Sequence, residues 1–198
     1  CTFSPDFSVP YNWGGYQQAA NGNAYCALGT YVPGWPNGRE FIGAQLSIPL
    51  ILGAKYFVSF KICLSISDPI QSYIANNKTG VMFSTNPYTW DKPAPITNNP
   101  HVYTNIIITD TINWTRIFGS FIADSSYKYI ILGNFFDDLN TDTITYVDTS
   151  SSFAYYYIDE ICVSTDSVFA SNYATEIKET NNQKDFSRFQ TKSAGGRI

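Results

Sequence analysis

The chain has little charge of either sign and almost no histidine. Its 198 residues include 12 Lys and Arg, 16 Asp and Glu and one His, for a formal net charge of −4. A protein that binds nucleic acid presents Lys and Arg along one face to meet the phosphates, and this sequence has no such stripe. We therefore expect no nucleic-acid partner and no attraction to an anionic membrane surface.

Catalytic motifs are missing as well. The sequence contains no G-x-S-x-G, no H-E-x-x-H and no P-loop, and His101 has no Ser or Cys beside it in a nucleophile motif. Asp159 and Glu160 are adjacent carboxylates, but neighbouring side chains of a strand point to opposite faces, which is poor geometry for acid/base catalysis on one bond. We expect a protein that is not an enzyme.

The cysteines are far apart in the sequence. Cys1, Cys26, Cys63 and Cys162 form no C-x-x-C pair, and with a single His a zinc site is disfavoured. Their even number, in a chain rich in Tyr, Asn and Thr, favours an oxidising compartment; four buried thiols are the alternative. A start at Cys1 rather than Met indicates a processed protein or a fragment, with a mature lipoprotein as a further alternative.

Aromatic residues, in contrast, are abundant. The chain contains 15 Tyr and 14 Phe, and 17% of its residues are aromatic, a composition that favours strands. No segment is long and apolar enough to span a bilayer, and no convincing amphipathic helix precedes residue 170. We expect an all-β fold, an antiparallel β-sandwich of jelly-roll type with long loops. Its strands are predicted at 23–31, 39–48, 56–66, 80–84, 106–109, 115–123, 128–136 and 155–163.

Two of these segments carry most of the information. Residues 56–66 alternate most clearly between core and non-core side chains, and the alternation places Cys63 on the non-core face. Residues 155–163 are predicted to close the domain. Ile158 and Ile161 are three positions apart, which alternation would put on opposite faces, so we expect a β-bulge at Asp159–Glu160 that returns both to the core.

The composition changes near residue 169. Residues 1–168 are predicted to form the sandwich domain, and residues 169–198, where Asn, Gln, Lys and Ser dominate, a polar tail. We interpret the tail as a linker, with docking on another chain as the alternative.

A series of short phrases runs in order from about residue 4 to residue 165. They are Ser4-Pro5-Asp6-Phe7, Val9-Pro10-x-Asn12-Trp13-x-Gly15-Tyr16-Gln17, Gly22-Asn23-Ala24-Tyr25, Arg39-Glu40-Phe41-Ile42, Gln45-Leu46, Tyr56-x-Val58-Ser59-Phe60 and Tyr157-Ile158-Asp159-Glu160-Ile161. Together they resemble the secreted jelly-roll modules of Bacteroidota surface proteins, which often precede a type IX secretion sorting domain or an OmpA-like domain.

This resemblance implies export to the extracellular face of the outer membrane and a galactose-binding-like sandwich, without implying an enzyme. Such modules usually open with a strand that reads like Asn-Pro-x-Phe-Glu, and this sequence lacks it. The loss would leave one sheet edge unpaired unless the tail or another chain fills it.

The resemblance also suggests a metal ligand and modification sites. In galactose-binding-like sandwiches an acidic residue of the last strand often helps to hold a structural calcium ion, and Asp159 occupies a similar place. Three tripeptides fit the Asp-Ser/Thr-aliphatic pattern of O-glycosylation in Bacteroidota and make Thr111, Thr143 and Ser167 candidate acceptors.

The cysteine pairing stays open among three connectivities. Jelly-roll order would make the strands of Cys63 and Cys162 neighbours, with both side chains on the non-core side, so a disulfide between them is the first prediction and leaves Cys1 with Cys26. A position of Cys162 beside Cys26, on the other neighbouring strand, is nearly as good.

Aromatic residues in loops are the candidate ligand-binding residues. Exposed rings stack on sugars, and we predict Trp13, Trp35, Tyr88 and Trp90 for this role; Tyr16 is interpreted as a cap on the end of the sandwich. The function expected is a non-enzymatic, extracellular binding or adhesion module whose partner is a glycan or another surface molecule. The alternative is a structural subunit that self-associates through an open sheet edge and the tail.

Overall fold

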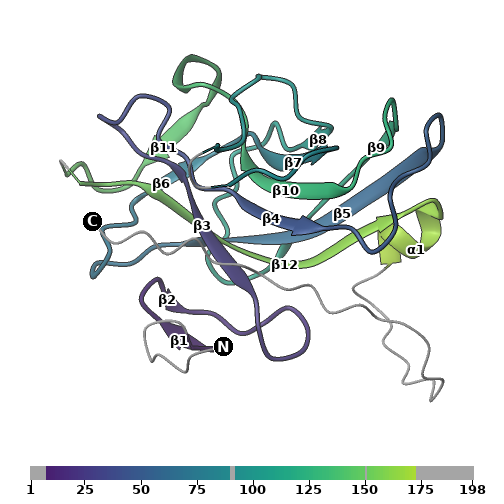
Figure 1. Ribbon diagram of the computed structural model, residues 1–198. Helices are drawn as coiled ribbons and strands as arrows, with labels where there is room; N and C mark the ends of the chain where they lie inside the picture. Colours follow the sequence, from purple (N-terminus) through teal and green to yellow (C-terminus); the bar gives the residue numbers. More distant parts are fainter. Residues whose placement is uncertain (1–7, 90–91, 150, 173–198) are drawn as a thin grey trace.

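The strands of the protein form two four-stranded antiparallel sheets that pack face to face (Figure 1). The computed structural model describes residues 8–89, 92–149 and 151–172. The β12 sheet has the order β3 (Cys26–Tyr31), β12 (Ala154–Ser164), β5 (Lys55–Ser65), β9 (Thr115–Ile122). The β10 sheet has the order β4 (Ile42–Gln45), β10 (Tyr129–Asn134), β7 (Thr79–Ser84), β8 (Val102–Tyr103). The prediction of an all-β sandwich built from antiparallel sheets is confirmed.

The core lies between the sheets and follows the alternation of the long strands. Every second residue of β5, from Tyr56 to Leu64, is buried in it, as the sequence pattern predicts. Tyr156 of β12 is fully buried, and its hydroxyl accepts a hydrogen bond from Asn76 N (2.9 Å) and donates to Ile108 O (2.8 Å). A buried hydroxyl with partners on both sides avoids the cost of an unpaired polar group, so this tyrosine is a stable centre of the core.

The closing strand β12 contains the predicted bulge. Its pairing with β5 shifts register between Asp159 and Cys162, and Glu160 is the extra residue, with a φ of +50°. Ile158 is fully buried, and Ile161 packs against the same core cluster. The bulge therefore keeps both isoleucines inward and turns Asp159 and Glu160 to the outer face.

Glu160 is compensated by one lysine. Its side chain is 4% exposed, and its carboxylate lies 2.8 Å from Lys61 Nζ on β5, whose side chain is 19% exposed. Neither oxygen of Glu160 has a well-aligned hydrogen bond among the described residues, so the ion pair is the main compensation for this buried charge.

The short elements were not predicted. β1 (Tyr11–Asn12) pairs with β2 (Gly15–Tyr16), and β6 (Ile74–Asn76) pairs with β11 (Thr143–Thr145), all within segments predicted as loops. The strand predicted at 106–109 is wrong. Ile108 is buried there, but its carbonyl accepts the Tyr156 hydroxyl instead of joining a ladder, so burial produced the apolar pattern without a strand.

The outer faces of both sheets are partly covered. Hairpin β1–β2 lies below one end of the β12 sheet in Figure 1, and α1 (Ser167–Asn172) lies at the other end. Ala170 of α1 is fully buried, and its carbonyl accepts a hydrogen bond from Ser59 on β5, so the packed domain continues past the predicted boundary at residue 168. The remainder of the predicted tail, from residue 173, lies outside the described residues. No helix in the described part of the chain is long and apolar enough to cross a membrane.

The Lys61–Glu160 pair provides a test of the bulge. We expect Lys61→Met to lower the free energy of unfolding by roughly 3 kcal/mol, because it leaves the Glu160 carboxylate buried without its counter-charge. Lys61→Met combined with Glu160→Gln should recover part of that loss. Urea unfolding followed by circular dichroism measures both, with Lys55→Met, an exposed lysine of the same strand, as the control. A loss no larger than that of the control would contradict the interpretation.

Candidate functional site

Three exposed aromatic rings lie together on hairpin β1–β2. Tyr11 and Tyr16 are directly opposite each other in the register, with ring centroids 4.8 Å apart and ring planes at 69°. Trp13 lies in the turn between them. The exposed fractions of Tyr11, Trp13 and Tyr16 are 69%, 59% and 53%. We call residues 11–16 the aromatic hairpin.

The polar side of the aromatic hairpin is fixed to the β12 sheet through Asn12. The Asn12 side-chain amide donates to the hydroxyl of Tyr25 (2.5 Å), and its oxygen accepts from the hydroxyl of Tyr157 (3.0 Å) and from Gly14 N (2.8 Å). Burial raises the pKa of Tyr25 and of Tyr157 above the usual tyrosine range, so both hydroxyls stay protonated and keep these bonds.

The turn of the hairpin is held by its backbone. Ser67 donates to the carbonyl of Trp13 (3.0 Å), and Ser65 donates to the carbonyl of Gly14 (2.5 Å). A Cβ on residue 14 would lie 2.5 Å from the Tyr157 hydroxyl and 3.0 Å from Ser65 Oγ, so the close contact with the sheet requires glycine there. The Trp13 ring is thus displayed from a backbone that is anchored on both sides.

The segment that follows the hairpin is also anchored. Gln17 is buried and its side chain donates to Ile112 O, while Trp114 donates its indole N–H to Gln18 O (3.0 Å). Ala20 N and Asn21 N donate to Asp159 Oδ2, at 2.8 and 3.3 Å. The chain therefore follows the outer face of the sheet from the hairpin to β3.

Asp159 has the role of an anchor for this segment. Its Oδ1 accepts a third backbone N–H, from Glu160, and burial raises the pKa of its carboxyl group although these hydrogen bonds lower it. Backbone N–H groups repel a cation, and the described residues contain no group of three His, Cys, Asp or Glu side chains that could hold a metal ion. The surroundings of Asp159 thus do not fit the predicted structural calcium site.

The stretch around the hairpin has no charge. No Asp, Glu, Lys, Arg or His occurs from residue 7 to residue 38, and its polar side chains are mostly amides and hydroxyls. A surface of aromatic rings beside uncharged hydrogen-bonding groups suits a ligand that is itself neutral and rich in hydroxyls.

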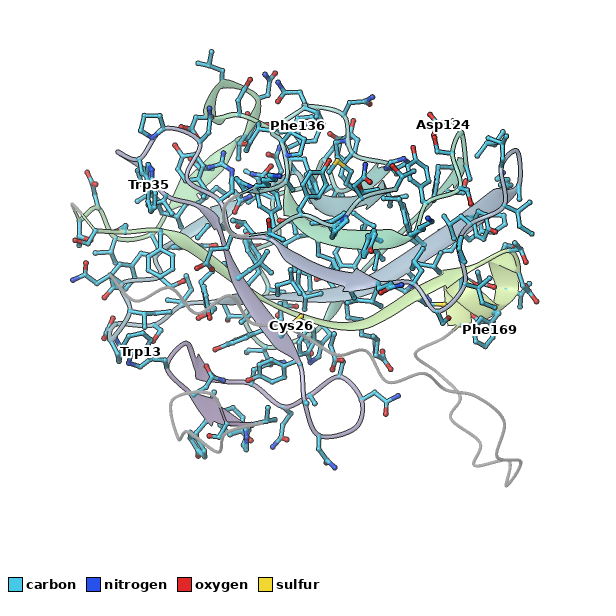
Figure 2. The ribbon with its side chains drawn as sticks, viewed as in Figure 1. Trp13, Cys26, Trp35, Asp124, Phe136 and Phe169 are labelled. Carbon is cyan, nitrogen blue, oxygen red and sulfur yellow. The ribbon has the colours of Figure 1, made fainter. Side chains whose placement is uncertain are left out.

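The other predicted ligand-binding aromatics do not join the aromatic hairpin in one site. Trp35 is 61% exposed in the loop between β3 and β4, and this loop is fixed to the segment after β10 by two hydrogen bonds between Asn37 and Asp138, both 3.0 Å. Figure 2 shows Trp13 and Trp35 at the same end of the molecule but below and above the sheets. Tyr88 is 38% exposed and follows β7, whose last residue Ser84 pairs with the first residue of β10, so it lies near the opposite end. Trp90 lies outside the described residues.

Tyr11 and Tyr16 are the residues that the sequence reasoning missed or misplaced. Tyr16 was interpreted as a cap, but it is more than half exposed. The signal was present in Tyr-Asn-Trp-Gly-Gly-Tyr: a two-residue turn places the flanking residues opposite each other, and Gly15 has the positive φ (+112°) that such turns use.

The predicted Cys63–Cys162 disulfide is wrong. The two strands are neighbours, as predicted, but Cys63 lies opposite Tyr157 and Cys162 lies opposite Ser59. Four positions along a strand correspond to about 13 Å, well beyond the separation that a disulfide bridges. Cys26, Cys63 and Cys162 are all free thiols, and burial raises the pKa of the first two to about 12 and that of Cys162 to about 11. A bond from Cys26 to Cys1 involves a residue outside the described range.

The three candidate glycosylation sites differ in exposure. Thr111 and Thr143 are exposed, whereas Ser167 is half-buried at the start of α1. The aspartates before Thr111 and Ser167 have structural roles, because Asp110 accepts the N–H groups of residues 112 and 113, and Asp166 those of residues 168 and 169. These tripeptides therefore match turn and helix-cap chemistry as well as the modification pattern.

His101 belongs to a polar chain at the other end of the sandwich. Phe83 N donates to His101 Nδ1 (3.1 Å), so the ring proton is on Nε2, which lies 3.1 Å from the Tyr127 hydroxyl; that hydroxyl donates to Asp124. Burial lowers the pKa of His101, although Asp124 opposes the shift. Since the rings of Phe83, Phe121 and Tyr127 surround it, the histidine is a neutral component of the packing.

Gly14→Ala should lift the hairpin from the sheet. The added methyl group collides with the Tyr157 hydroxyl, so we expect faster hydrogen exchange at the amides of residues 14–17 and a change in Trp13 fluorescence, with the core amides unchanged. Gly43→Ala is the matched control, because a Cβ there meets its nearest atoms at the ordinary distances of 3.8 and 3.9 Å. Equal exchange in the two variants would refute the close contact.

Acid should weaken the fold through His101. The pKa of this group is lower in the folded protein than its ordinary value near 6.5, so the unfolded chain binds more protons and stability is lost as the pH falls below about 6.5 towards the folded pKa. His101→Gln keeps an acceptor for Phe83 N–H without titrating. We expect the urea midpoint of the natural protein to fall more than that of the variant between pH 7.5 and 5.5; parallel declines would contradict this.

The chain was compared with known proteins once this geometry was established. No protein-family model and no curated protein matches it. A function for the chain is therefore inferred from the aromatic hairpin and its surroundings.

Proposed function

We propose that this protein is a non-enzymatic binding module that holds the sugar rings of a neutral glycan against the aromatic hairpin. The observation that carries the proposal is the display of three exposed rings, Tyr11, Trp13 and Tyr16, on a hairpin whose backbone and whose Asn12 are fixed to the β12 sheet.

The chemistry of the surface favours a carbohydrate. The C–H faces of a sugar ring stack on aromatic faces, and its hydroxyls bond to neutral amides such as Gln18, which already donates to the Tyr16 hydroxyl (2.9 Å). Tyr11 and Tyr16 meet edge to face, so the hairpin offers ring faces in two directions rather than one flat platform. The absence of charge from residue 7 to residue 38 favours a neutral glycan over an acidic one.

The rigidity of the hairpin favours binding over a merely structural role. Tyr and Trp lose little side-chain entropy on binding because they have two rotatable bonds, and a backbone that is already ordered adds little to the cost. Rings that cap a core become buried, whereas each of these three is more than half exposed.

The proposed location is the outside of a Bacteroidota-like cell. The phrase Asn12-Trp13-x-Gly15-Tyr16-Gln17, part of the resemblance to secreted jelly-roll modules, falls on the aromatic hairpin and the residue after it. The exposed hydroxyls of Thr111 and Thr143 lie where an O-glycan could be attached. In this setting the module serves adhesion or retention of glycan at the surface.

The proposal is tested on an array of neutral glycans. We expect Trp13→Ala, and separately the double variant Tyr11→Ala with Tyr16→Ala, to weaken binding about tenfold or more, because a buried aromatic anchor contributes on the order of 1.5–3 kcal/mol. Trp35→Ala is the matched control, with an equally exposed ring (61%) on another anchored loop. Failure to bind any neutral glycan, or binding unaffected by the hairpin variants, would disprove the proposal.

A further inference from the structure

Strand β9 is an edge of the β12 sheet that nothing in the described part of the chain covers. Its eight residues pair with β5 in an unbroken register, and Ala123 continues the ladder through hydrogen bonds with residues 53 and 54. The strand contains no proline, no bulge and no inward charge, the features that usually protect an edge from pairing with another strand.

The outer face of β9 carries an ordered row of side chains. Phe118 is 44% exposed and Ile122 is 65% exposed, with Arg116 and Ser120 also exposed in the same alternation. Asp124 continues the row directly after the strand, at the upper right of Figure 2. Phe118 stacks on Phe57 of β5, so the apolar part of the row is preformed.

We propose that β9 pairs antiparallel with β9 of a second copy of this chain, with Ser120 opposite Ser120. In that register Phe118 of each copy lies opposite Ile122 of the other, and Arg116 of each lies opposite Asp124 of the other. Moving the centre by one residue, to Gly119 or Phe121, places Arg116 opposite Ile122 or Ser126 instead. The centre at Ser120 therefore matches the apolar pair and the opposite charges at the same time.

The two charged groups are positioned for this contact. Arg116 donates to the carbonyl of Ser171 at the end of α1, which holds its guanidinium over the outer face. Asp124 accepts from Tyr127, and a carboxylate has room for further donors. A guanidinium has five donors, so each group can take its partner in the second copy without giving up its present bond.

The dimer has a consequence for the aromatic hairpin. The two-fold axis of an antiparallel pair is perpendicular to the sheet, so two β12 sheets join into one continuous sheet of eight strands with both outer faces on the same side. Both aromatic hairpins then face the same way, and a glycan that reaches both would gain avidity. This last step rests on the proposed function, whereas the pairing itself does not.

Sedimentation of the full chain over a concentration series tests the pairing. The monomer mass is 22.2 kDa, and we expect twice that value at micromolar concentration. Arg116→Asp alone and Asp124→Arg alone each oppose like charges twice in the dimer and should raise its dissociation constant about tenfold or more. The two changes together exchange the charges and should restore the dimer, even though both internal bonds of these groups are lost.

Further variants keep the test decisive. Ser120→Lys places two ammonium groups opposite each other on the axis and should dissociate the dimer without touching the charged pair. Asp148→Arg, the same charge change at an exposed loop residue, should leave the dimer intact. A monomer at all concentrations overturns the proposal, also where β9 amides resist hydrogen exchange because another segment of the chain covers them. A dimer or larger species that ignores the charge reversals overturns it too. Neither outcome depends on whether a glycan binds.

Discussion

The single extra residue in β12 is the constraint on which the rest of the structure depends. β12 is a central strand, paired with β3 on one side and β5 on the other, and a strand with core residues at both Ile158 and Ile161 cannot keep simple alternation. Glu160 absorbs the difference at a φ of +50°, and Lys61 compensates the charge that is buried with it. The core is therefore continuous, and a pair of carboxylates is turned to the outer face.

The aromatic hairpin depends on the same strand. Tyr157, on the outer face of β12, fixes Asn12 and limits residue 14 to glycine, and Asp159 fixes the segment at residues 20 and 21. Two positions of one core strand thus hold a surface element more than 130 residues away in the sequence, since Tyr157 and Asn12 are 145 residues apart. Rigidity of the candidate site follows from rigidity of the core, which is the condition for presenting exposed rings at low entropic cost.

The sequence predicted what alternation and spacing determine. The core face of β5 and the bulge of β12 follow from local patterns, because a pleated strand has a fixed period and two isoleucines three apart violate it. The strand neighbours of Cys63 and Cys162 were also correct. Their register was not, since it depends on where each strand starts in the ladder, and local sequence does not record this. The same limit hid the aromatic hairpin: its turn is legible, but its exposure depends on Asn12 facing the sheet, which tertiary contacts decide.

The hairpin and the β9 edge are separate surfaces of one sheet. β3 and β9 are its two edges, with β12 and β5 between them, and the hairpin is fixed mainly to β12 and to the end of β5. Pairing along β9 therefore leaves the aromatic rings uncovered, and occupation of the rings leaves the edge backbone available. A single aromatic surface of three rings supports weak affinity, whereas two copies on one face multiply it through effective concentration without any new contact. Such a sheet combines the two roles that the sequence alone leaves as alternatives, because the edge that makes the assembly also determines how the binding surfaces are presented.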